Sequence, residues 1–222
     1  MTTPQLISKL PKVGTTIFTV MSALASEKNA INLGQGFPDF ECDPSLLDAV
    51  NNAMRSGYNQ YPPMAGIPIL RDRISSKIAN LYGHHYDPTT EITITAGGTQ
   101  GIITAVLSCV HPGDEVIVIE PVYDSYIPSI ELAGGKAVGV QMIIERNDAG
   151  VVNGFSIPWD QLSKSITSKT RMIMINSPHN PTGMVWGPED LNKLADLVKN
   201  TNILICSDEV YEHMVFDNAA HQ

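Results

Sequence analysis

The amino-acid sequence predicts an α/β protein in which a mostly parallel β-sheet lies between two layers of helices, a three-layer α/β/α domain. Two observations support this fold class. Short apolar runs alternate with helical segments from residue 91 to residue 209, an order that is typical of a parallel sheet. The runs are apolar throughout, which indicates strands that are buried on both faces of the sheet.

The residues before this alternating region predict three helices and two loops. Segment 16–29 repeats apolar residues at helical spacing, and segments 44–57 and 69–83 have helical patterns that each end at a glycine. The string AINLGQGFPDF at 30–40 predicts a short strand that runs into a loop. The string YNQYPPMAGIP at 58–68 predicts a second loop, because glycine and proline interrupt regular structure.

The alternating region itself predicts a series of strands that are joined by helices. One polar interruption, residues 145–157, is expected to form a hairpin that leaves the sheet. The strands are expected at 91–95, 115–120, 136–142, 171–177 and 202–209, and the helices at 99–110, 124–133, 158–167 and 187–200.

Composition limits the classes of partner. The net charge is −9 and the pI is near 5.0, which argues against nucleic-acid binding because that needs a cationic surface. The three cysteines are widely spaced, and they are expected to be free thiols in a reducing compartment. No segment approaches the roughly 20 apolar residues that span a bilayer. We therefore expect a cytoplasmic protein with small-molecule ligands and no membrane partner.

Chemistry-bearing residues gather where the predicted strands end, and ligands of parallel sheets bind at that edge. Gly98, Thr99 and Gln100 open a helix, where backbone N–H groups can bind a phosphate. A tight turn with Thr99 as the helix cap explains the same string. Tyr123 follows the strand at 115–120 and offers a ring face for stacking on a flat heterocycle, although a core or surface tyrosine would look the same.

Two further loops carry amides and a carboxylate. Asn176 and Asn180 offer neutral hydrogen-bond donors to a ligand oxygen, although Asn-Pro pairs are also common in turns. Asp208 follows an apolar run, and a carboxylate there needs a donor or a cation as its partner; a surface helix cap is the alternative. Taken together, the loops suit a planar, phosphorylated ring that carries a positive charge.

Six strings, which occur in one order along most of the chain, resemble a known family. The chain is similar to the pyridoxal-phosphate aminotransferases of fold type I, class I/II, and most of all to the branch that contains methionine and kynurenine aminotransferases. The resemblance implies pyridoxal 5′-phosphate as the cofactor and the large domain of that fold as the architecture. The strings are LGQGFPDF, QYPPMAG, TAGGTQ, EPVYDSY, NSPHNPTG and SDEVYEH.

The resemblance also implies a role for each matching residue. Asp208 would pair with the protonated pyridine nitrogen, and Tyr211 and Asn180 would hydrogen-bond the phenolic oxygen of the ring. Tyr123 would stack on the ring, and Asn176 matches a family asparagine that lies beside the cofactor. The remaining implied contacts are Gly98, Thr99 and Gln100 with the phosphate, Tyr61 with the phosphate in a neighbouring subunit's site, and Gly36, Asn180 and Phe18 with the substrate.

The lysine that forms a Schiff base with the cofactor in this family is absent from the chain. The family carries it after the SDEVYEH string, whereas all nine lysines of this sequence precede Asp208. The resemblance therefore implies the amino-terminal portion of an aminotransferase, incomplete at the C-terminus and inactive by itself. Residues 1–44 would form the N-terminal arm and part of the small domain. Residues 45–222 would form the cofactor-binding large domain, truncated before the lysine.

The implied activity of the intact protein is transfer of an amino group from an amino acid to a 2-oxo acid by a homodimer. The donor would be methionine or an aromatic or glutamine-like amino acid. A carbon–sulfur β-lyase uses the same cofactor contacts, so it remains an alternative. A non-catalytic remnant that binds a ligand or a partner is the third possibility.

Overall fold

The computed structural model describes residues 7–36, 38, 40–214 and 216, and the chain divides into two compact units. The unit that we call the sheet unit takes Met1–Gly14 and Gly97–Gln222, as far as these residues are described. The second, the helical unit, is Thr15–Ala96. The candidate site lies in the sheet unit, so this unit is described first.

The sheet has four strands in the order β2-β1-β5-β6, and every pair is parallel. The register places Asn176, the last residue of β5, opposite Asp208, the last residue of β6. Both side chains are therefore brought to the same edge of the sheet. The strands are β1 (Glu115–Glu120), β2 (Lys136–Gln141), β5 (Thr170–Asn176) and β6 (Leu204–Asp208).

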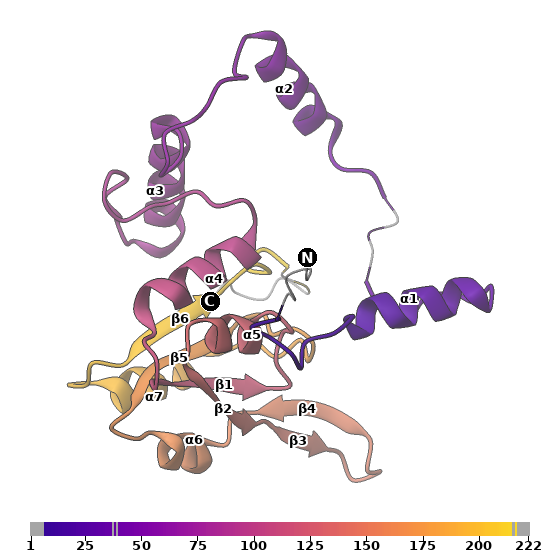
Figure 1. Ribbon diagram of the computed structural model, residues 1–222, viewed down its shortest axis with the longest axis vertical. Coiled ribbons are helices and arrows are strands. Elements are labelled where there is room, and N and C mark those ends of the chain that lie inside the picture. Colours follow the sequence, from indigo (N-terminus) through magenta and orange to yellow (C-terminus); the bar gives the residue numbers. More distant parts are fainter. Residues whose placement is uncertain (1–6, 37, 39, 215, 217–222) are drawn as a thin grey trace, which may run out of the picture. The chain divides into compact units, whose positions relative to one another are not determined.

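Helices cover both faces of this sheet (Figure 1). Along β1, Val116 and Val118 pack with residues of α4 (Gly98–Cys109) and α5 (Tyr126–Leu132) in one buried cluster. Ile117 and Ile119, which point to the opposite face, pack with residues of α6 (Trp159–Ser165) and α7 (Pro188–Val198). Since neighbouring residues of a strand face opposite sides, the continuous apolar run fills both cores. The predicted three-layer α/β/α fold class is confirmed.

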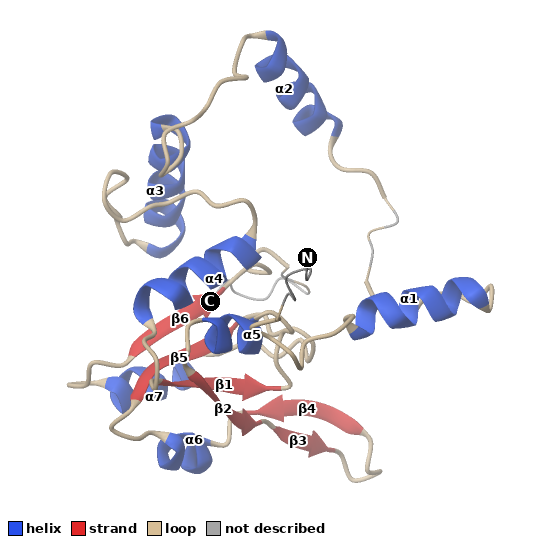
Figure 2. Cartoon of the chain, viewed as in Figure 1, coloured by secondary structure: helices blue, strands red, loops and turns tan. Residues whose placement is uncertain are grey.

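The predicted interruption is a two-stranded antiparallel hairpin outside the main sheet, as Figure 2 shows. It consists of β3 (Ile143–Arg146) and β4 (Val152–Ser156). Asn147 closes the turn, because its backbone N–H donates to Val151 at 2.9 Å and its side chain accepts from the Val151 N–H at 3.0 Å.

Three helices form in the helical unit, close to the predicted segments. They are α1 (Ile17–Glu27), α2 (Pro44–Arg55) and α3 (Pro68–Tyr82). Thr16 and Asp43 cap the first two, since their side chains accept from the backbone N–H groups of Thr19 and Ser45. The third ends at Gly83, whose φ of 69° is the left-handed conformation that glycine adopts without strain.

Two strands that the sequence predicts do not form among the described residues. Residues 91–95 have no strand partner there, and a backbone hydrogen bond from the Ile94 N–H to the Ala65 carbonyl, at 3.0 Å, ties them to the loop before α3 instead. No strand forms in the described part of 30–40 either. An apolar run becomes a strand only where another strand offers a ladder of hydrogen bonds, and local pattern does not reveal this.

The sheet ends at β6, which pairs with β5 alone in the part of the chain that the structure describes. Its apolar residues Leu204 and Ile205 are 37% and 38% exposed. The second edge of this strand is therefore open. Among the same described residues, no helix has the length and apolar character to cross a membrane.

Candidate active site

A pocket of about 170 Å³ lies where β5 and β6 end, beside the first turn of α4. Four segments far apart in the sequence contribute to it, and they are the strand-end loops that the sequence singled out. The lining residues are Gly98, Thr99, Ile102, Tyr123, Asn176, Asn180, Asp208, Val210 and Tyr211. Most of the predicted cofactor residues therefore converge on one cavity.

Asn176 ties the ends of the two strands to the loop that follows β5. Its Nδ2 donates to the Asp208 backbone carbonyl at 2.8 Å, and its Oδ1 accepts from the Asn180 backbone N–H at 2.6 Å. The side chain is 4% exposed, so both contacts are shielded from water. Asn176 thus fixes the backbone that carries Asn180 and Asp208, and these two residues reach the pocket.

The Asp208 carboxylate accepts a hydrogen bond on each oxygen. The Tyr126 hydroxyl donates to Oδ2 at 2.6 Å, and the Val210 backbone N–H donates to Oδ1 at 3.2 Å. Burial of Tyr126, followed by its hydrogen bond to Asp208, raises the pKa of this phenol far above its ordinary value of 10.0. Burial and then the charge of Asp208 likewise raise the pKa of the Cys206 thiol. Both neighbours stay neutral, so neither of them neutralises the carboxylate that lines the pocket.

Sequence reasoning did not single out Tyr126. It is 3% exposed, and it begins α5 three residues after Tyr123. The two rings meet edge to face, with centroids 5.8 Å apart and planes at 76°, an arrangement that aromatic rings favour. The two tyrosines stand three residues apart in the string EPVYDSY, and a turn joins them in which the Tyr126 backbone N–H donates to the Tyr123 carbonyl at 3.2 Å.

The first turn of α4 forms one end of the pocket, where Gly98 and Thr99 line it. Gly97 caps the helix with a φ of 90°, and the helix begins at Gly98. The first N–H groups of a helix have no carbonyl partner within the helix and carry its positive dipole end. A side-chain carbon at Gly98 would meet no other atom within 4 Å. This open space and these donors fit a phosphate group.

The other predicted site residues lie outside the lining of this pocket. Gln100 is in the first turn of α4 and does not line it. Tyr61 is 98% exposed in the helical unit, Phe18 is half-buried in α1, and Gly36 is exposed. Their contacts with cofactor or substrate stay predictions. Phe37 and Asp39 of the GQGFPDF string lie outside the described residues.

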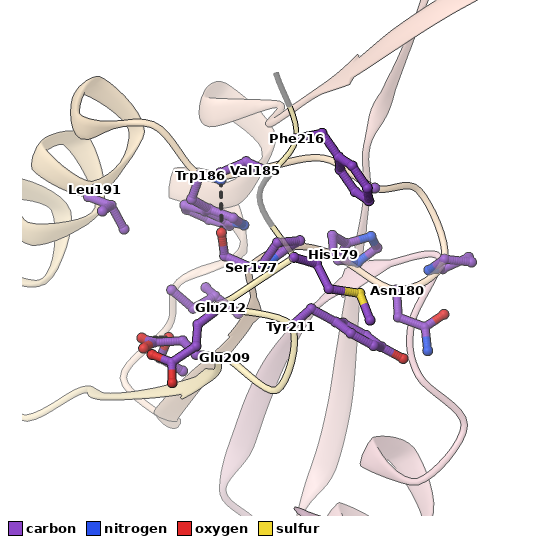
Figure 3. Close-up of a pocket in the computed structure, with 16 residues that line it drawn as sticks. Ser177, His179, Asn180, Val185, Trp186, Leu191, Glu209, Tyr211, Glu212 and Phe216 are labelled. Atoms are coloured by element: carbon purple, nitrogen blue, oxygen red, sulfur yellow. Dashed lines mark hydrogen bonds between the residues drawn. The ribbon is translucent and has the colours of Figure 1, made fainter. Parts of the chain in front are cut away.

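A larger pocket of about 700 Å³ adjoins the first and shares Asn180 and Tyr211 with it (Figure 3). Its lining is mainly apolar and includes two carboxylates, Glu209 and Glu212. Acidic side chains repel a phosphate, and α7 (Pro188–Val198) contributes to this lining only the apolar Leu191 and not its first residues. The smaller pocket is therefore the candidate active site, although it has the smaller volume.

The donor set of the smaller pocket fits pyridoxal 5′-phosphate. Asp208 supplies a charge for the pyridinium, Tyr211 and Asn180 supply donors for a ring oxygen, and the start of α4 suits the phosphate. Tyr123 lines the same cavity with its aromatic ring. The residues that the sequence proposed separately thus form one chemically consistent set.

Comparison with known proteins identifies the family of this chain. Residues 28–222 match the model of "Aminotransferase class I and II". A solved methionine aminotransferase from Escherichia coli superposes with a TM-score of 0.90 at 40% identity, over 100% of this chain and 56% of that chain. The N-succinyldiaminopimelate aminotransferase of Mycobacterium tuberculosis gives 0.89 at 43% identity, over 98% and 55%. The human kynurenine–oxoglutarate transaminase 1 is 36% identical over 89% of this chain and 48% of its own length.

The resemblance to this branch of the family, and with it pyridoxal 5′-phosphate as the cofactor, is confirmed at the level of the family. The chain spans about half the length of the curated relatives that it matches. Its match to the family model nevertheless covers most of its own residues. The chain belongs to the class I and II aminotransferases.

Proposed function

We propose that the protein that carries this chain transfers an amino group from an amino acid to a 2-oxo acid. The observation that carries the proposal is the Asp208 carboxylate, held at the pocket by hydrogen bonds from two neutral donors, the Tyr126 hydroxyl and the Val210 backbone N–H. When bound there, pyridoxal 5′-phosphate would supply an electron-withdrawing ring that stabilises negative charge on the reacting carbon of the substrate. Its pyridinium would be the cation that pairs with the carboxylate.

The chain's own residues bind and orient the reactants. Asp208 keeps the ring nitrogen protonated, because an ionised carboxylate favours the charged form of a neighbour. Tyr211 and Asn180 would hold the phenolic oxygen, and Asn180 would also bind the substrate carboxylate. Tyr123 would cover one face of the ring and exclude water from it. The α4 start would hold the phosphate through Gly98 and Thr99, which line the pocket, and through Gln100 in the same turn.

The rest of the catalytic machinery belongs to a longer protein in this proposal. The lysine that bonds to the cofactor and moves the proton lies beyond residue 222, and the 222-residue chain is inactive alone. Residues 1–44 belong to the arm and the small domain, and 45–222 to the large domain. The longer protein would be a cytoplasmic homodimer, in which the fully exposed Tyr61 would reach the cofactor phosphate in the other subunit's site. Gly36 and Phe18 contact the substrate.

The substrate class follows from the relatives. Proteins named methionine, N-succinyldiaminopimelate and kynurenine aminotransferases all match this chain. Methionine, aromatic and glutamine-like amino acids are therefore the donors to assay first, with 2-oxoglutarate and shorter 2-oxo acids as acceptors.

The test uses the full-length gene product and measures both products of the reaction. We expect a new amino acid to appear in equal amount to the new 2-oxo acid. Asp208→Asn should lower kcat/KM on the order of 100-fold, because it removes a charge that stabilises the transition state. Asp196→Asn, which changes an exposed acid on α7, is the matched control and should behave like the parent.

Two outcomes contradict the proposal. Full activity in the Asp208→Asn variant would remove the role of the carboxylate. Release of ammonia and pyruvate from a sulfur-containing amino acid, without any need for a 2-oxo acid, would assign the protein to the β-lyases instead.

A further inference from the structure

We propose that Tyr126 is a positioning residue whose hydroxyl holds the Asp208 carboxylate in the orientation that meets the ring nitrogen of the cofactor. The inference rests on the proposed function, because it needs a ring nitrogen at the pocket. It concerns a residue that does not itself line the pocket. Tyr126 acts through Asp208.

The geometry limits how the carboxylate can turn. One oxygen accepts from a side chain and the other from the backbone. The Tyr126 hydroxyl donates to Oδ2 at 2.6 Å, and the Val210 backbone N–H donates to Oδ1 at 3.2 Å. The shorter contact is the side-chain one, and hydrogen bonds to an ionised acceptor are short and strong. Without the hydroxyl, the longer backbone contact alone would set the side-chain rotation. The carboxylate would then spend part of its time away from the ring.

Tyr126 is itself fixed, which a positioning residue must be. Its ring is 3% exposed and belongs to the buried cluster between the sheet and helices α4 and α5. Its backbone N–H donates to the Tyr123 carbonyl at 3.2 Å. The edge-to-face contact with Tyr123 links it to the ring that lines the pocket. Tyr126 therefore contacts both the Tyr123 ring and the Asp208 carboxylate, and it can hold both in place.

The chemistry of a phenol suits this task. A phenol donates one hydrogen bond and stays neutral, and burial keeps the pKa of Tyr126 above its ordinary value, so it remains a donor. A lysine or arginine in its place would orient the carboxylate but would also neutralise it. A phenylalanine would preserve the packing and lose the orientation. Only the neutral donor leaves the full negative charge for the pyridinium.

The test measures binding instead of turnover, in the full-length gene product. The first probe is pyridoxamine 5′-phosphate, which binds without a covalent bond to lysine. The second probe is its analogue with C–H in place of the ring nitrogen. We expect Tyr126→Phe to weaken binding of the first probe about tenfold, the usual effect of losing a hydrogen bond to a charged group. Binding of the second probe should hardly change.

A spectroscopic signature accompanies this loss. The ultraviolet absorbance of the bound probe reports protonation of its ring nitrogen. In Tyr126→Phe that nitrogen should lose its proton at a lower pH than in the parent, by about one unit for a tenfold weaker interaction. A role in folding alone would not move this titration.

Two further variants separate positioning from stability. Ser129→Ala removes another buried hydroxyl of α5, which donates to the Ser125 carbonyl at 2.7 Å and does not contact Asp208. It should bind both probes like the parent. In an Asp208→Asn background, Tyr126→Phe should cause no further loss of preference for the first probe, since the charge that it orients is gone.

The possible outcomes separate a failure of the positioning role of Tyr126 from a failure of the proposed function. Equal weakening of both probes by Tyr126→Phe, or a similar effect of Ser129→Ala, would overturn the positioning role. So would unchanged affinity and an unchanged titration in Tyr126→Phe. Failure of the unaltered protein to bind either probe would overturn the proposed function, and the inference with it.

Discussion

The two glycines at the start of α4 should respond in opposite ways to the same substitution. Gly98 is the first residue of the helix, lines the pocket, and has open space where a side-chain carbon would be. Gly97, the residue before it, has a φ of 90°. Replacement of each by alanine adds one methyl group at neighbouring positions. The pair therefore separates loss of stability from loss of phosphate binding.

The magnitudes follow from these positions. Gly98→Ala meets no protein atom, and alanine in a helix is favoured over glycine by roughly 0.5–1 kcal/mol, so the free energy of unfolding should stay the same or rise. The methyl group occupies the phosphate space, however. Loss of one charge-assisted hydrogen bond, about 1.5–3 kcal/mol, lowers affinity by about 10- to 150-fold. Gly97→Ala instead forces alanine into a backbone conformation (φ 90°, ψ 166°) that is essentially restricted to glycine, which costs roughly 1–3 kcal/mol of stability.

Two assays on the full-length gene product check this prediction. Urea unfolding gives the free energy of unfolding of each variant, and titration with pyridoxamine 5′-phosphate gives the affinity. Inorganic phosphate should displace the probe from the parent and compete less well in Gly98→Ala. Parental affinity in a stably folded Gly98→Ala variant would refute the placement of the phosphate at this helix start.

Three further predictions concern stability, and urea unfolding checks each of them. Gly135→Ala would place a carbon 2.7 Å from Val110 Cγ1 and 3.2 Å from Ile130 Cγ2. Such overpacking of the core should lower the free energy of unfolding by about 1–3 kcal/mol. An unchanged midpoint of urea unfolding would contradict this prediction. Burial lowers the pKa of His179 below its ordinary value of 6.5, so the unfolded state binds more protons than the folded state near that pH. The free energy of unfolding should therefore fall as the pH drops below 6.5. His179→Gln should make the free energy of unfolding less dependent on pH in this range. Asn176→Ala removes the acceptor of the Asn180 backbone N–H and leaves the Asp208 carbonyl with the Ser177 backbone N–H as its donor. The change should cost about 1–3 kcal/mol, whereas the exposed Asn147→Ala should cost less.

Much of the sheet could be predicted because its strands are short and apolar throughout. The run at 115–120 became β1 with the same bounds, and its neighbouring valines and isoleucines fill opposite cores. The run at 91–95, EITIT, alternates polar and apolar residues as a half-buried strand does, but it pairs with no strand among the described residues. Pairing depends on a partner elsewhere in the polypeptide, which a local strand pattern does not reveal.

The site was predictable to the extent that register brings strand ends together. Asn176 and Asp208 were singled out separately, and the parallel register makes them neighbours. Tyr126 was missed because its contact with Asp208 spans 82 positions and depends on how α5 crosses the sheet. A tyrosine at a helix start has many possible partners, and only the packed structure selects one.

The edge position of β6 has a consequence for the site, since this strand pairs with β5 alone among the described residues and carries Asp208 at its end. An unpaired edge frays more readily than a strand held on both sides. A segment that pairs with this edge would reduce the fraying and hold the Asp208 carboxylate in place. Cofactor affinity should therefore rise when a peptide that pairs with β6 is supplied in trans.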